Sequence, residues 1–98
     1  MDVYLRIIRG TKYVLVAACD NDLLGKCFRE GKMKLEVSRD FYGTKLSSLE
    51  KTVQIVRDAD VANLVGRKVV EAAVRRGLVD REAVILIAGI PHVQVMKL

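Results

Sequence analysis

The sequence predicts an α+β fold, a mainly antiparallel sheet with two helices packed on one of its faces. Three observations support this prediction. The chain opens with the alternating pattern of a β-hairpin, continues through two segments of helical periodicity, and closes with a second pair of short apolar strands. Strands at both ends with helices between them are typical of an α+β domain.

The N-terminal hairpin has the clearest pattern. Residues 3–9 alternate, so Val3, Leu5 and Ile7 fall on one face. Gly10 suits the first central position of a type II′ turn. Residues 13–19 are apolar on both faces and predict a central strand. After a capped turn at residues 20–24, we expect a short middle strand over residues 34–38 and a turn at residues 41–44.

Two helices are expected next. Ser47 and Glu50 stand at capping-box spacing, and an apolar stripe follows them. The second helix is predicted over residues 61–76, with Asp58 or Asp60 as its cap and Gly77 ending it. Its apolar positions recur at i, i+3 and i+4, namely Ala62, Val65, Val69 and Ala73.

A C-terminal hairpin completes the sheet. It pairs strands over residues 83–88 and 92–96. Pro91 belongs at the turn or at the start of the last strand, because proline cannot donate a ladder hydrogen bond.

Length and composition indicate one domain, residues 1–98, with an aliphatic core, since 51% of residues are apolar and Trp is absent. Residues 1–10 lack the apolar segment of a signal peptide, so a cytoplasmic location is expected. Two cysteines are too few for a disulfide scaffold, although a single Cys19–Cys27 disulfide is an alternative that the sequence allows.

The charge favours acidic partners. The net charge is +5 and the isoelectric point is about 9.5, which permits RNA binding without requiring it, because 12 acids accompany the 17 bases. No membrane partner is expected, because no apolar run reaches spanning length.

The segment 19–34 is the candidate working surface. It holds two glycines, Phe28 and four bases, which are Lys26, Arg29, Lys32 and Lys34. These bases can contact a nucleic-acid backbone while Phe28 stacks on one base, and Arg6 of the hairpin extends the surface. The alternative is a solvated basic loop with Phe28 folded into the core.

The same segment excludes several metal and phosphate sites. Asp20 and Asp22 resemble the start of a calcium loop, but Leu24 and Gly31 stand where oxygen ligands are required. A structural zinc site needs four ligands, commonly in closely spaced pairs, whereas this chain has two cysteines eight residues apart and one distant histidine. The Walker pattern also fails, because Cys27 replaces the magnesium-binding hydroxyl after Lys26. No metal and no cofactor are expected.

A polar contact to a ligand or partner is a further possibility. His92 is the only histidine, and His92 and Gln94 point the same way on the last strand, so they join Asp20 and Asp22 as candidates. The alternative is a solvated or core-edge histidine. Cys27 has cationic neighbours, which favour a reactive thiol. The alternative is an inert cysteine, which is the usual case.

Several blocks resemble a known family: DNDLLGK (residues 20–26), FREG (28–31), FYG (41–43), ANLVG (62–66) and GIPHVQV (89–95). Together they are similar to a small archaeal family of uncharacterised single-domain proteins, a domain of unknown function. The resemblance implies an archaeal cytoplasmic protein and a link to translation, but no activity. It also implies that a cysteine is usual at position 19 and less so at position 27, so a Cys19–Cys27 pair is not a shared feature of the family.

These observations favour a non-enzymatic module that binds RNA or a ribonucleoprotein through the basic segment. One alternative is a protein-interaction or homo-oligomeric module that uses a sheet edge or the strand GIPHVQV. Another is a small-ligand site or enzyme, which requires Asp20, Asp22, Cys27 and His92 to converge on one pocket.

Overall fold

The structure is a computed structural model of the chain, and it describes residues 2–97. Its elements are β1 (Asp2–Arg9), β2 (Val14–Asp20), β3 (Cys27–Glu30), β4 (Met33–Glu36), α1 (Arg39–Tyr42), β5 (Leu46–Ser48), α2 (Leu49–Asp58), β6 (Val61–Val65), α3 (Arg67–Arg75), the 3₁₀ turn η1 (Arg81–Ala83), β7 (Ile85–Ile87) and β8 (Ile90–Met96). Within residues 2–97 no helix is long and apolar enough to cross a membrane.

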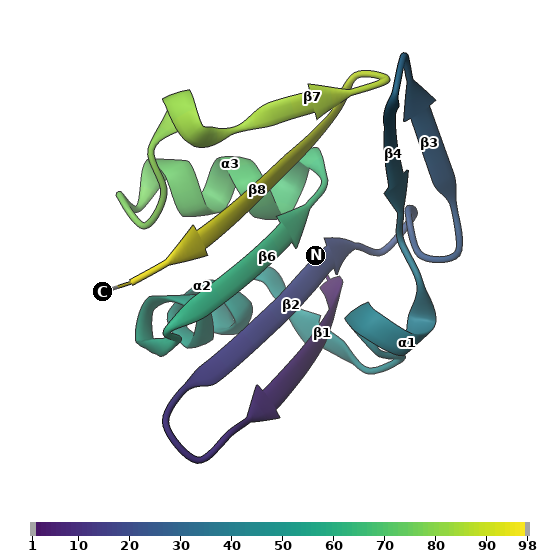
Figure 1. Cartoon of the computed structure of the whole chain (residues 1–98). Coiled ribbons are helices and arrows are strands. Elements are labelled where there is room, and N and C mark those ends of the chain that lie inside the picture. The colour runs from purple at the N-terminus through teal and green to yellow at the C-terminus, as the bar shows by residue number, and fades with distance from the viewer. Residues whose placement is uncertain (1, 98) are drawn as a thin grey trace.

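Six strands form one mixed sheet in the order β5-β1-β2-β6-β8-β7 (Figure 1). Four of its pairings are antiparallel, and β2 pairs with β6 in parallel. A parallel pair needs a crossover connection, which the segment through α2 supplies. The remaining strands, β3 and β4, form a separate two-stranded ribbon. The predicted α+β class is confirmed.

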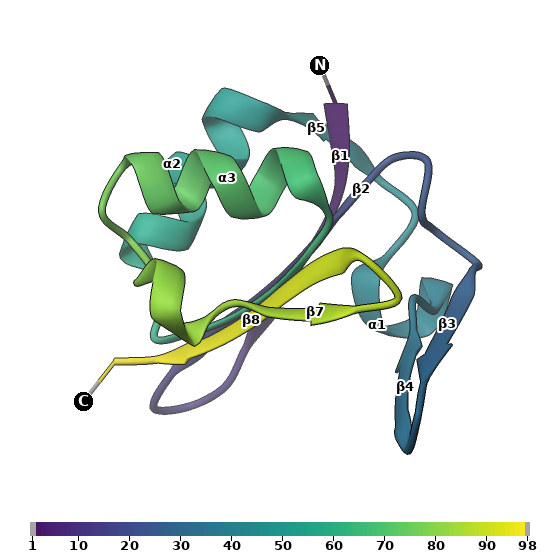
Figure 2. The same cartoon turned by 90° about the horizontal axis from the view of Figure 1, so that it is seen from above.

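Each face of the sheet has its own core. Helices α2 and α3 lie together on one face (Figure 2). They bury the helix-side core, which includes Val16, Leu64, Val69 and Val93. On the other face, α1 and the ribbon cover the hairpin-side core, which includes Cys19, Leu35, Tyr42, Val65 and Ile87. The sheet is therefore covered on both sides by short elements.

The predicted helix over residues 61–76 is wrong in its first part. Residues 61–65 form β6, the strand between β2 and β8. A short apolar run fits both a helical stripe and a strand buried on two faces, so periodicity cannot separate the two. The helix α3 starts only after Gly66, whose φ of 118° is unsuited to a helix. Asp60 caps no helix, since its Oδ2 accepts from Val14 N at 2.7 Å.

Three smaller differences concern local elements. Residues 27–30 form strand β3, which the sequence pattern did not predict, and residues 41–42 belong to α1 rather than to a turn. The cap of α2 is Ser48 instead of Ser47, because the Ser48 Oγ accepts a hydrogen bond from Lys51 N at 3.1 Å. The last strand begins at Ile90, so Pro91 lies near its start as expected.

Candidate nucleic-acid interface

The basic residues of the candidate segment lie on and around the β3–β4 ribbon. Its register sets Phe28 opposite Leu35, and Arg29 opposite Lys34. Because successive side chains of a strand point to opposite faces, these two pairs lie on opposite sides of the ribbon. Leu35 is buried in the hairpin-side core, so Arg29 and Lys34 point to solvent.

Lys26 and Lys32 complete this basic set. Lys26 precedes β3 at the base of the ribbon, and Lys32 lies in the turn at its tip. Both side chains are exposed, and Lys34 forms an ion pair with Glu36 at 3.2 Å. We call Lys26, Arg29, Lys32 and Lys34 the ribbon surface.

Two residues predicted for this surface lie elsewhere. Phe28 is half-buried and packs against the hairpin-side core, so its ring turns away from the ribbon surface. Arg6 lies on β1, where its guanidinium donates to the carbonyl of Asp40. The sequence pattern could not show this, because an aromatic residue next to bases fits a stacking platform and a core position equally well.

The ribbon is attached to the rest of the fold at both ends. At its base, Gly25 N donates to Val37 O at 2.7 Å, and Val37 N donates to Lys26 O at 2.9 Å. Near its tip, Glu30 Oε1 accepts from Ala88 N at 2.6 Å, in the turn after β7. The ribbon surface is therefore presented on a fixed element.

Asp20 has a structural position. Its Oδ2 accepts from Lys68 N at 2.8 Å and its Oδ1 from Val69 N at 3.0 Å, so the carboxylate caps the N-terminus of α3 from the end of β2. Only 3% of Asp20 is exposed. Burial raises its pKa above the usual value, although the two hydrogen bonds act in the opposite direction.

Asp22, in contrast, is exposed in the turn that follows β2. It lines a shallow cavity of about 280 Å³ at the start of α3, together with Asp20, Leu23, Arg67, Lys68, Gly89, Ile90 and Pro91. Both signs of charge meet there, so the cavity has no clear preference for an anion or a cation.

His92 is a core-edge residue, with 8% of its surface exposed. Its Nδ1 lies 3.0 Å from the carbonyl oxygen of Leu64. A carbonyl can only accept, so Nδ1 carries the proton. The Nε2 then accepts from Gln94 Nε2 at 3.4 Å. These contacts hold the ring in the sheet.

Asp20 and His92, two of the four residues of the small-ligand alternative, lie on opposite faces of the sheet. The register sets Cys19, Val65 and His92 side by side on the hairpin side of the sheet, whereas Asp20 points to the helix side. Within residues 2–97 no three acidic, cysteine or histidine side chains are grouped as metal ligands would be.

The two cysteines are both free and differ in environment. Cys19 is buried in the hairpin-side core, and its burial raises the pKa of the thiol to about 12. Cys27 is exposed at the start of β3. The thiol of Cys19 therefore stays protonated at neutral pH. Because both cysteines are free, they form no disulfide with each other.

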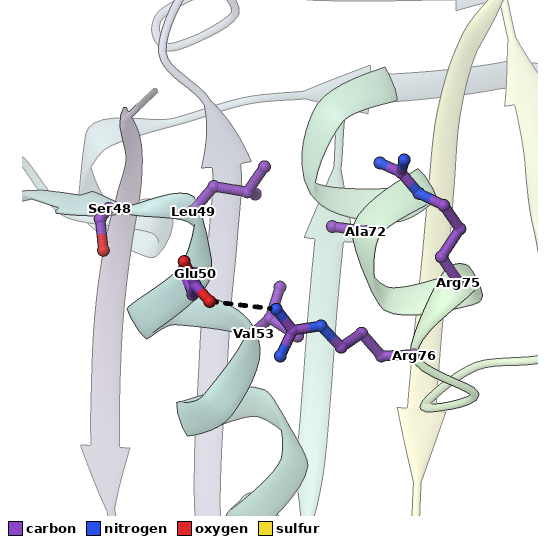
Figure 3. A pocket seen from close by; sticks show the side chains of 7 residues that line it. All are labelled: Ser48, Leu49, Glu50, Val53, Ala72, Arg75 and Arg76. Atoms are coloured by element: carbon purple, nitrogen blue, oxygen red, sulfur yellow. Dashed lines mark ion pairs between the residues drawn. The ribbon is translucent and has the colours of Figure 1, made fainter.

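The cavity between the two main helices was not predicted from the sequence. It has a volume of about 540 Å³ and lies between α2 and α3, lined by Ser48, Leu49, Glu50, Val53, Ala72, Arg75 and Arg76 (Figure 3). Arg76 reaches across it to Glu50, with 3.5 Å between the charged atoms. No local motif marks this cavity, because its residues come from two separate helices and the residues that cap them.

Comparison with known proteins agrees with the fold. A crystal structure of an uncharacterized conserved protein from Methanopyrus kandleri matches with a TM-score of 0.77 and 26% identity. The match covers 100% of this chain and 95% of the other chain. No curated protein matches this chain. The model of one family, DUF424, described as a protein of unknown function, matches residues 8–98. The chain therefore belongs to the DUF424 family, which confirms the resemblance to an uncharacterised family.

Proposed function

We propose that this protein binds structured RNA, free or within a ribonucleoprotein, through the ribbon surface. The observation that carries the proposal is the direct pairing of Arg29 with Lys34 on the solvent side of the ribbon. Like charges opposite each other destabilise a strand pair. The exposed ion pair of Lys34 with Glu36 offsets part of that repulsion, and a phosphate between the two cations can replace it. Lys26 and Lys32 extend the positive charge to the base and tip.

Contacts of this kind read shape and charge rather than sequence. Phe28 faces the core, so the ribbon surface offers no aromatic platform for an unstacked base. Lysine and arginine side chains on a narrow ribbon suit the phosphates that line a groove of a folded RNA. The proposed activity is therefore backbone recognition with little sequence preference and with strong dependence on salt.

A matched pair of variants tests the proposal. Arg29→Gln/Lys34→Gln removes two charges from the ribbon surface, and Arg9→Gln/Lys12→Gln removes two from the β1–β2 end of the sheet. Each variant lowers the net charge from +5 to +3. The β1–β2 turn lies at the other end of the molecule from the ribbon (Figure 1).

Binding to a labelled RNA hairpin is measured by fluorescence anisotropy from about 50 mM to about 200 mM salt. The ribbon variant should lose most of its affinity, and its slope of log K against log salt should become shallower by about 1.5, because two phosphate contacts are lost. The control should keep the wild-type slope. Equal losses in both variants, or no binding by the wild type, would refute the proposal.

A further inference from the structure

The outer edge of β1 is only half covered. β5 pairs with residues 2–4, and Leu5 N donates to Lys45 O at 3.0 Å, after which the neighbouring chain leaves the sheet. In an antiparallel strand every second residue directs its backbone groups to the same side. Ile7 and Arg9 therefore point their N–H and C=O groups outward as Leu5 does. Within residues 2–97 no backbone hydrogen bond reaches them.

Gly43 sets the limit of this open edge. Its φ is 79°, and a Cβ there would stand 3.2 Å from the Leu5 carbonyl oxygen and 3.2 Å from the Arg6 Cβ. The chain thus passes tightly against β1 at residues 5 and 6 and frees the edge from Ile7 onward. Three residues of β1 remain available for pairing.

A groove runs beside this edge. It has a volume of about 590 Å³ and is lined by Leu5, Arg6, Ile7, Gly43, Thr44, Lys45, Leu46, Ser47, Lys51 and Ile55. Three of its side chains are cationic, and its apolar part comes from Leu5, Ile7, Leu46 and Ile55. None of these described lining residues is acidic. The groove thus joins unpaired backbone groups, an apolar floor and a positive rim.

We propose that this edge binds an extended acidic segment of a partner protein as an added strand. Main-chain hydrogen bonds to Ile7 and Arg9 would hold it, as in other sheet-edge complexes. Peptide residues opposite Ile7 and Arg9 would point to the same face of the sheet as Ile55, which is apolar. The peptide residue opposite Arg6 would point to the other face, where the Arg6 guanidinium lies. An alternation of apolar and acidic residues fits both sides.

Charge argues against a second copy of the chain at this edge, and backbone chemistry argues against RNA. A second copy pairing through β1 would bring the positive rim formed by Arg6, Lys45 and Lys51 beside the same rim of its partner, which is unfavourable. An RNA strand has no alternating amide donors and carbonyl acceptors to continue the ladder. The acidic peptide is the occupant that satisfies both the backbone and the rim.

Synthetic peptides test the pairing. The probe is a peptide of alternating Glu and Val, compared with a Lys–Val peptide and with two N-methylated forms of the Glu–Val peptide. Methylation at Val removes the amides that should face β1, and methylation at Glu removes those that face solvent. Binding is followed by the amide NMR shifts and hydrogen exchange of the protein.

The Glu–Val peptide should shift and protect the amides of Ile7 and Arg9. The Lys–Val peptide and the Val-methylated peptide should bind at least tenfold more weakly, and the Glu-methylated peptide should bind as the parent does. The amides of Gln94 and Met96 are the internal control, because they lie beyond β7 on the other edge of the sheet. Shifts centred there, equal binding of all peptides, or no binding would overturn the proposal.

Two protein variants give an independent check. Arg9→Pro removes the outward amide and leaves the β1–β2 ladder, whereas Arg9→Ala keeps the amide and loses the same side chain. The proline variant should lose peptide binding by at least tenfold relative to the alanine variant. Equal binding by two folded variants would contradict the proposal, and the peptide series decides the matter if the proline variant does not fold.

Discussion

Tyr42 connects α1 to the sheet through one short hydrogen bond. Its hydroxyl donates to Asn63 Oδ1 at 2.6 Å, and its ring meets Phe41 edge-on with 4.9 Å between the centroids. Burial raises the pKa of Tyr42 far above its usual value, so the phenol remains a donor throughout the physiological range. This contact crosses the hairpin-side core and explains why a polar Asn63 is tolerated within β6.

Removing the hydroxyl should therefore destabilise the fold. We expect Tyr42→Phe to lower the free energy of unfolding by about 1 to 3 kcal/mol, because Asn63 loses a buried donor. Urea denaturation provides the measurement. Tyr13→Phe is the matched control, since Tyr13 is 52% exposed and should change stability little. Equal effects of the two variants would show that the hydrogen bond contributes nothing.

Because of Cys19, the free energy of unfolding should fall as the pH rises in the alkaline range. Its pKa rises from 9.0 to about 12 on folding, so the unfolded chain releases its proton first. The stabilisation is fully present below about pH 9 and is lost as the pH rises toward about 12, by about 1.4 kcal/mol per pH unit.

Urea unfolding at about pH 8 and about pH 10.5 measures this loss. Cys19→Ala should show a smaller decrease between the two values than the wild type, while Cys27→Ala should follow the wild type because Cys27 is exposed. An unchanged decrease in Cys19→Ala would mean that another group is responsible.

Among the elements, α3 depends most on its neighbours. Gly66 stands at its N-cap and has no side chain to accept a hydrogen bond, so Asp20 of β2 supplies the acceptor from outside the helix. The carboxylate comes so close that a Cβ on Gly66 would stand 2.3 Å from Asp20 Cγ. Asp20 can therefore cap α3 only because residue 66 has no side chain, and Gly66 leaves the cap to Asp20.

A pair of glycine variants separates close contact from backbone strain. Gly66→Ala should lower the free energy of unfolding by about 3 kcal/mol or more, because strain at positive φ is joined by the clash with Asp20. Gly77→Ala should cost about 1 kcal/mol, since its φ is 72° and its Cβ would meet nothing within 4 Å. Thermal or urea denaturation compares the two. Similar losses would show that Asp20 moves away freely.

At the scale of the whole molecule, the ribbon has two roles on its two sides. Its inner side closes the hairpin-side core, and its outer side carries the ribbon surface. It forms a sheet of its own, and the six-stranded sheet takes no strand from it. The main sheet and its two helices can therefore persist without the ribbon, at a cost in buried surface.

Replacing residues 27–36 with a two-residue Asn-Gly turn tests this division. Lys26 and Val37 are already hydrogen-bonded and can flank the new turn. We expect a folded protein by circular dichroism that is about 3 to 6 kcal/mol less stable, because the buried Leu35 and the half-buried Phe28 are lost. RNA binding should disappear as well. A shortened protein that still binds RNA would move the proposed interface elsewhere.

Local sequence determined the elements whose pattern is self-contained. The hairpin of β1 and β2, the helix α2 and the C-terminal pair β7 and β8 all follow from alternation, turn residues and caps within short windows. The same holds for the α+β class. The presence of a basic segment could also be predicted, because charge is visible in the sequence itself.

Tertiary packing decided the rest. Residues 61–65 became a strand because β2 and β8 pair with them along both edges, and a local periodicity does not record such pairing. Phe28 turned inward because the sheet offered an apolar face, and Asp20 became a helix cap because β2 ends beside Gly66. Which bases share a surface, and which strand edge stays open, depend on contacts between residues distant in the chain, so only the folded molecule settles them.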